Sequence, residues 1–215
     1  MRKRKSRRPI KSKRKTKLIL IGSLMIFITL GFFSYKYLNL YLIQDKEERS
    51  VKYYLNKVTD KIIDNNIDED ITEEKDLINY IAVVEIPKIK LVRGLVDKND
   101  SLNNVDYNIQ ILKESTMPNV DYSNLYLAAH SGSSSVSYFK YLDRLIYNDE
   151  VYIYYQNIKY IYKVVKLYEI DKNGYAEIQR RGSTKHLILV TCIDGTEKQL
   201  VIICDLKEER EGNEV

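Results

Sequence analysis

An uncharged run of eighteen residues, 18–35, places the strongest constraint on this chain. It is close to the roughly 20 apolar residues that cross a hydrocarbon layer about 30 Å thick. Eleven Lys or Arg and no acid precede it in residues 1–17, and such a block stays on the cytoplasmic side. We therefore expect a basic cytoplasmic tail at 1–17, a transmembrane anchor at 18–43, and the rest of the chain outside the cell.

A cleaved secretory signal peptide is the alternative for this segment. Its apolar region would be about 7–15 residues long and would end at a small-residue cleavage site. The observed run is longer, and Tyr35, Tyr37 and Tyr41 lie at its end, where an Ala-x-Ala pattern would be needed. Tyrosines are typical of a membrane–water interface, so the anchor is favoured.

The net charge of +5 comes from the tail alone. Without residues 1–17, the totals of 35 basic and 30 acidic residues become 24 and 30, a net charge of −6. A nucleic-acid-binding protein would spread its basic residues over a folded face. We therefore expect a membrane partner and no nucleic acid.

The remaining chain divides into a linker, 44–79, a domain, 80–208, and a short tail, 209–215. The linker begins with apolar residues at helical spacing, from Val51 to Ile63, and continues as a polar spacer. The domain consists of short β-branched and aromatic runs with few helical stretches, which indicates a mainly β barrel or sandwich. Expected strands are 80–86, 91–96, 107–112, 125–130, 150–156, 159–169, 186–192 and 199–206. Two further stretches are expected to be helical or 3-10, namely 137–146 and a short turn near 175–181.

Two Cys and two His offer a nucleophile and an acid/base partner. If 186–192 and 199–206 form a hairpin, Cys192 lies opposite residue 199 and Cys204 opposite residue 187. The two cysteines are then roughly 17 Å apart along the ladder, too far for a disulfide. His186 is roughly 20 Å from Cys192 on the same strand, which leaves His130 as the partner. Cys204 is expected to be a small core residue, and His186 a surface residue at a strand entry.

Four short segments resemble the sortase family over roughly residues 80–206. Leu189-Val190-Thr191-Cys192 resembles the strand that ends at the sortase cysteine, and Leu127-Ala128-Ala129-His130-Ser131 resembles the strand leading to its histidine. Ile86-Pro87-Lys88-Ile89 and Tyr138-Phe139-x-x-Leu142 resemble the segment near the start of the domain and the short helix after the histidine.

The resemblance implies a closed eight-stranded barrel, class D-like, with short helices. It implies a transpeptidase in which Cys192 is the nucleophile and His130 its acid/base partner. Substrates would be surface proteins or pilins with an LPXTG-like (Leu-Pro-x-Thr-Gly) sorting signal. The acceptor would be a peptidoglycan-precursor or pilin amine, and no cofactor or metal is expected. The family's arginine is replaced by Gln199, so Gln199 or Lys198 would stabilise the transition state.

Two alternatives stay open. An inactive, membrane-tethered sortase-like module would bind peptides without turnover, and the replacement of arginine by Gln199 favours it. An unrelated extracytoplasmic thiol peptidase would release a free acid instead of an amide.

Overall fold

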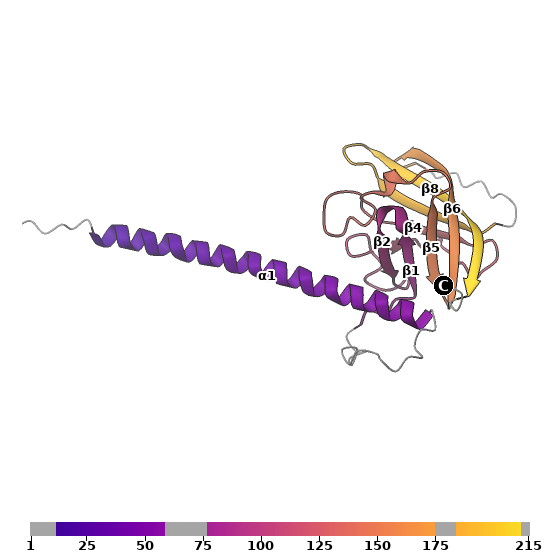
Figure 1. Cartoon of the computed structure of the whole chain (residues 1–215). Helices are drawn as coiled ribbons and strands as arrows, with labels where there is room; N and C mark the ends of the chain where they lie inside the picture. Colours follow the sequence, from indigo (N-terminus) through magenta and orange to yellow (C-terminus); the bar gives the residue numbers. More distant parts are fainter. Residues whose placement is uncertain (1–11, 59–76, 175–183, 212–215) are drawn as a thin grey trace, which may run out of the picture. The chain divides into compact units, whose positions relative to one another are not determined.

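The structure is a computed structural model that describes residues 12–58, 77–174 and 184–211 (Figure 1). The chain divides into two units, Met1–Asp45 and Lys46–Val215. The described residues of the first unit form the N-terminal part of a helix, and the second unit holds the β-domain together with the last part of that helix. The short turn expected near 175–181 lies outside the described residues.

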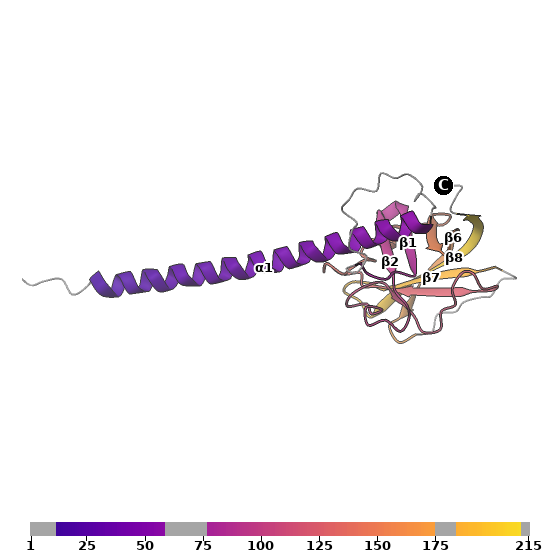
Figure 2. The same cartoon turned by 90° about the horizontal axis from the view of Figure 1, so that it is seen from below.

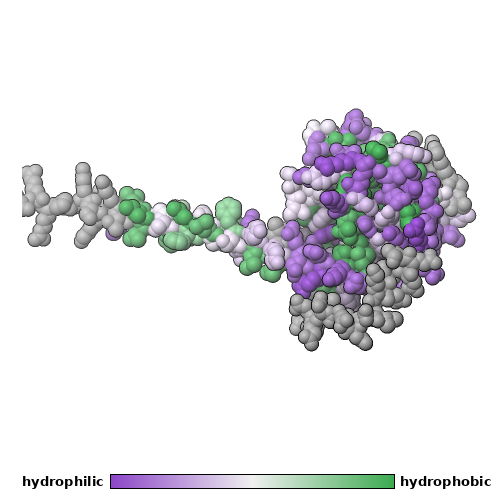
Figure 3. All heavy atoms as spheres, in the orientation of Figure 1, coloured by the Kyte–Doolittle hydropathy of each residue, from purple (hydrophilic) through white to green (hydrophobic). Residues whose placement is uncertain are grey.

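Helix α1, Ser12–Val58, is one continuous element. It spans both the expected anchor, 18–43, and the expected juxtamembrane helix that follows, without an interruption at residue 43. No Gly or Pro occurs between residues 32 and 58, so nothing interrupts the backbone hydrogen bonds. Among the described residues, this helix alone is long and apolar enough to cross a membrane, and Figure 3 shows apolar side chains along its exposed length.

The β-domain is a nearly closed eight-stranded barrel, which confirms the expected fold class. The strand order is β2-β1-β5-β6-β8-β7-β4-β3, and Figure 2 shows β7 beside β8. Among the described strands, every neighbouring pair is antiparallel except β4–β7, which is parallel. The strands are β1 Ala82–Ile86, β2 Leu91–Leu95, β3 Gln110–Ile111, β4 Asn124–Ala128, β5 Glu150–Tyr155, β6 Ile158–Asp171, β7 His186–Cys192 and β8 Lys198–Glu211.

Some expected boundaries differ from the structure. Only Gln110–Ile111 of the expected strand 107–112 is a strand, and the expected strand 125–130 ends at Ala128. Strand β8 continues to Glu211, into the segment expected to be a tail, because its charged end pairs with the start of β6. The stretch 137–146 contains a 3-10 turn, η3 Leu142–Arg144, and a second one, η2, spans Pro87–Ile89.

Apolar residues fill both faces of the sheet around β7. On the inner face, Leu187 and Leu189 belong to the main core inside the barrel. On the outer face, Ile188 forms a second cluster with Val201 and Ile203 of β8. A strand buried on both faces is an almost continuous apolar run, which explains the composition of 186–192. The outer face of β4, β7 and β8 therefore carries an apolar surface, where a mostly polar surface would be usual.

Candidate active site

The parallel pairing of β4 with β7 brings the candidate histidine and cysteine to the same end of the sheet. In this register, Asn124 pairs with His186 and Ala128 with Val190. The contact continues beyond the ladder, where the Ala129 N–H donates to the Val190 carbonyl at 3.3 Å. If the same register is continued by two residues beyond the end of β4, residue 130 is expected beside residue 192, at the spacing of about 4.8 Å between neighbouring strands.

Alternation along the two strands predicts that both side chains lie on one face. Ala129 and Leu189 belong to the inner core, so the alternation, continued beyond the end of β4 to residue 130 and along β7 to residue 192, predicts the outer face for both. Consistent with this, the side chain of His130 is 42% exposed and Cys192 is half-buried. Thr191, the residue before Cys192, donates its hydroxyl to the Ala129 carbonyl at 2.8 Å.

The β7–β8 hairpin confirms the expected cysteine register. Cys192 pairs with Gln199, and Leu187 pairs with Cys204. Both cysteines are free thiols. Cys204 is fully buried inside the barrel, and this burial raises the pKa of its thiol far above the ordinary value. Because the thiolate is the reactive form, Cys192 is the better nucleophile of the two.

Gln199 and Lys198 lie on opposite sides of β8. Residues directly opposite in an antiparallel pair share a face, so Gln199 lies on the outer face with Cys192. Lys198 alternates to the other side, where its ammonium bonds to Glu169 at 3.0 Å. The hydrogen bond that Lys198 donates to this carboxylate raises the pKa of Lys198. The geometry therefore favours Gln199 over Lys198 as a group near the thiol.

Asp106 is a candidate that sequence reasoning missed. Its carboxylate Oδ1 lies 3.3 Å from Nε2 of His130. A third group that orients the base is common in nucleophile–base pairs. The loop before β3 carries several Asp and Asn residues without a distinguishing pattern, so no sequence signal separates Asp106 from its neighbours.

Backbone and side-chain bonds tie the histidine loop to its surroundings. The carbonyl of His130 accepts from the Phe139 N–H at 3.0 Å. The hydroxyl of Ser131 donates to Asp194, in the β7–β8 turn, at 3.1 Å. These contacts connect the segment after β4 both to the core and to the turn that follows Cys192.

The expectation that His186 is a surface residue was wrong. It is 4% exposed, and its Nδ1 lies 2.8 Å from the Asp205 carboxylate on β8. The cross-strand pair His186–Asp205 accounts for this burial, because a buried polar ring requires a hydrogen-bond partner. It lies at the opposite end of β7 from Cys192, as the strand spacing predicts.

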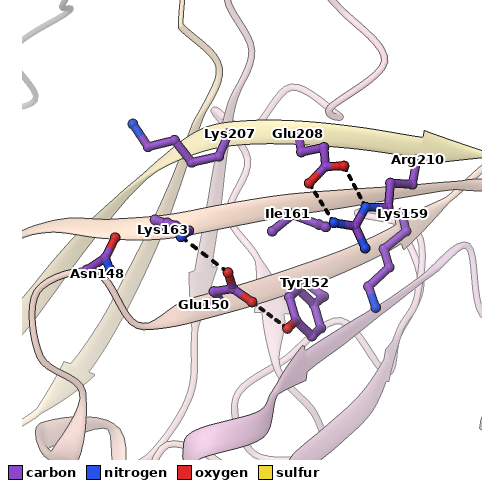
Figure 4. A pocket seen from close by; sticks show the side chains of 9 residues that line it. All are labelled: Asn148, Glu150, Tyr152, Lys159, Ile161, Lys163, Lys207, Glu208 and Arg210. Atoms are coloured by element: carbon purple, nitrogen blue, oxygen red, sulfur yellow. Dashed lines mark hydrogen bonds and ion pairs between the residues drawn. The ribbon is translucent and has the colours of Figure 1, made fainter. Parts of the chain in front are cut away.

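A hollow of about 610 Å³ on β5, β6 and β8 contains none of the predicted site residues. Figure 4 shows two ion pairs among its charged groups, with Lys163 3.4 Å from Glu150 and Arg210 bonded to Glu208 at 2.6 Å. The other lining residues are Asn148, Tyr152, Lys159, Ile161 and Lys207. This is a salt-bridged surface depression and not the candidate site.

Comparisons with known proteins identify the fold and the family of this chain. A family model described as "Sortase domain" matches residues 84–207. Sortase C1 from Streptococcus agalactiae shares 20% identity and a TM-score of 0.54, over 77% of this chain and 90% of that one. Sortase E1 from Streptomyces coelicolor, solved with a tripeptide in its active site, shares 20% identity and a TM-score of 0.52, over 62% and 91%.

Listeria monocytogenes sortase A shares 16% identity and a TM-score of 0.52, over 61% of this chain and 90% of that one. The search of curated protein sequences gave no match. At these identities, the structural matches establish the fold, whereas the family model covers more than half of the chain.

A thiol-directed probe should label Cys192 and not Cys204 in the folded chain. The buried thiol is inaccessible and its raised pKa keeps it protonated. Mass spectrometry of the labelled chain, before and after unfolding, measures both sites. Cys192→Ala should abolish labelling of the folded chain, and Cys204→Ala should leave it. Equal labelling of both cysteines in the folded state would contradict the assignment.

Proposed function

Since this chain belongs to the sortase family, we propose that it is a membrane-anchored cysteine transpeptidase that cleaves an LPXTG-like sorting signal. Cys192 is the nucleophile and His130 the acid/base partner. The observation that carries the proposal is the β4–β7 register, which continues to a neighbouring position for these two residues. The apolar surface on the outer face of the sheet supports the proposal that an extended peptide binds there, next to these two residues.

The first half of the reaction forms a thioester. The Cys192 thiolate, stabilised by an imidazolium at His130, attacks the scissile carbonyl of the signal. As the tetrahedral intermediate collapses, the carbon–nitrogen bond breaks and His130 gives its proton to the leaving amine. The N-terminal part of the substrate stays bonded to Cys192, and the C-terminal fragment leaves.

The second half transfers the substrate to an amine. Neutral His130 removes a proton from the incoming amine, whose nitrogen attacks the thioester carbonyl. The carbon–sulfur bond breaks, the Cys192 thiolate is regenerated, and the product is an amide. The covalent intermediate divides one difficult step into two easier ones.

The substrates we propose are surface proteins or pilins, and the acceptor is an amine of a cell-wall precursor or pilin. The apolar part of α1 and the basic block at 1–17 support a single-pass anchor with the β-domain outside the cell.

Product analysis with and without an added amine tests this function. The full chain should convert a sorting-signal peptide to an amide when a glycine-terminated amine is present, and Cys192→Ala and His130→Ala should each lose turnover. Cys204→Ala, which removes the other thiol, is the matched control and should retain it. A free acid as the main product despite excess amine would identify a thiol peptidase instead.

Gln199 should act as a neutral transition-state donor. Its amide lies opposite Cys192, and losing one oxyanion donor costs about 10²–10³ in kcat. Gln199→Ala should therefore lower kcat by about that factor with a smaller effect on KM, while Gln199→Arg should retain activity. Lys198→Ala, next to it on the other side of the strand, is the control.

Steady-state amide formation by these variants and the parent decides the role. A fully active Gln199→Ala would show that the amide does not stabilise the transition state. Binding of the signal peptide by the parent without any turnover would favour the inactive binding module.

A further inference from the structure

Side chains bridge the gap between the two edge strands of the barrel, β2 and β3, which we call the seam. Strands β2 and β3 end the sheet order, and among the described pairings they are not joined to each other. Instead, the Asn108 amide donates to the Gly94 carbonyl of β2 at 2.9 Å. Its Oδ1 accepts from Nε of Arg93 at 2.8 Å. Asn108 therefore connects the segment before β3 to the edge of β2.

Arg93 is a buried cation with a carboxylate partner from the helix. The residue is 7% exposed, and both of its terminal nitrogens bond to the carboxylate of Glu47 in α1. Its guanidinium lies 4.1 Å from the ring centre of Tyr138. Burial disfavours the charge, but the hydrogen bonds and charge of Glu47 outweigh it and raise the pKa of Arg93. Glu47 is thus the group that makes a cation at this position tolerable.

The last part of α1 is docked on the barrel at further points. The Ser50 hydroxyl accepts from the Ile78 N–H at 2.9 Å, and the Tyr54 hydroxyl donates to the Ile81 carbonyl at 2.6 Å. Apolar contacts join Tyr54 and its neighbours to Val83 of β1. Figures 1 and 2 both show this end of the helix beside β1. Residues 46–58 therefore belong structurally to the β-domain.

Two short routes lead from Arg93 to the candidate histidine. On the first, Asn108 lies two residues after Asp106, whose carboxylate faces His130 at 3.3 Å. On the second, Tyr138 stacks on Arg93 and precedes Phe139, whose N–H bonds to the His130 carbonyl. The hydroxyl of Tyr138 also reaches the Tyr107 carbonyl at 3.4 Å, which joins the two routes.

We propose that Glu47 of the juxtamembrane helix is a positioning residue for His130, acting through Arg93. The inference rests on the proposed function, because it assigns His130 to catalysis. Glu47 fixes the guanidinium, and the guanidinium fixes both the Asp106–Asn108 segment and the ring of Tyr138. The helix that anchors the chain is in this way part of the support of the catalytic base.

The first test compares Glu47→Gln with Glu48→Gln in the full chain. Glu48 is exposed on the same helix, so its change controls for an altered helix charge. Glu47→Gln should lower kcat about tenfold with KM nearly unchanged, because a misplaced catalytic group affects the chemical step. Glu48→Gln should match the parent. An unchanged kcat in folded Glu47→Gln would overturn the proposal.

A double-mutant cycle with Asp106→Asn separates positioning from loss of folded protein. If Glu47 acts through the histidine and its carboxylate, Glu47→Gln should have a much smaller effect on kcat in the Asp106→Asn background. Full additivity would contradict the proposal.

If Glu47→Gln does not fold, Tyr138→Leu removes the ring beneath Arg93 and keeps the ion pair. The same loss of kcat and the same non-additivity are expected, and a parent-like kcat would overturn the proposal.

The alkylation rate of Cys192 by iodoacetamide gives a readout that does not require transpeptidation. A well-placed His130 stabilises the thiolate, so Glu47→Gln should slow alkylation and Glu48→Gln should not. If Cys192 of the parent is alkylated rapidly but the parent transfers no peptide, the proposed function is contradicted. The alkylation rates of the two variants then still decide whether Glu47 positions His130. Identical alkylation rates in all three chains would reject the positioning proposal itself.

Discussion

The parallel register between β4 and β7 is the constraint on which the candidate site depends. Five consecutive residue pairs, Asn124–His186 to Ala128–Val190, fix it. A shift by one residue would turn either side chain to the other face. The inner core packing of Leu127 and Leu189 opposes such a shift, since it would expose apolar side chains. Burial of the core thus specifies the position of His130 relative to Cys192.

A second constraint operates at the barrel seam. The backbone ladder stops at β2 and β3, and a buried cation, Arg93, occupies the gap with Asn108. An unpaired charge there would be strongly destabilising, so the fold depends on a carboxylate that the β-domain sequence 80–208 does not supply. Glu47, from the last part of α1, provides it. Residues 46–58 of this helix are therefore connected to the β-strands by charge as well as by apolar contact.

The sequence predicted the elements with periodic apolar residues and missed those held by polar side chains. The β7–β8 hairpin and the pair Cys192–Gln199 were predictable from alternation and a turn signal. The short extent of β3 was not, because the chain before it forms a turn in which the N–H groups of Tyr107 and Asn108 both bond to the Asn104 carbonyl. Nor was the burial of Arg93, whose partner Glu47 lies 46 residues away in sequence and has no shared pattern with it.

The most direct test of the account is the proximity of residues 130 and 192. In a His130→Cys, Cys204→Ala chain, the two remaining thiols would be on neighbouring strands about 4.8 Å apart, within the range for a disulfide. Mild oxidation of the folded chain should join residues 130 and 192 rapidly, and mass spectrometry of the digested chain measures that link. A chain that stays reduced when folded, and forms the bond only after unfolding, would contradict the register and the active site built on it.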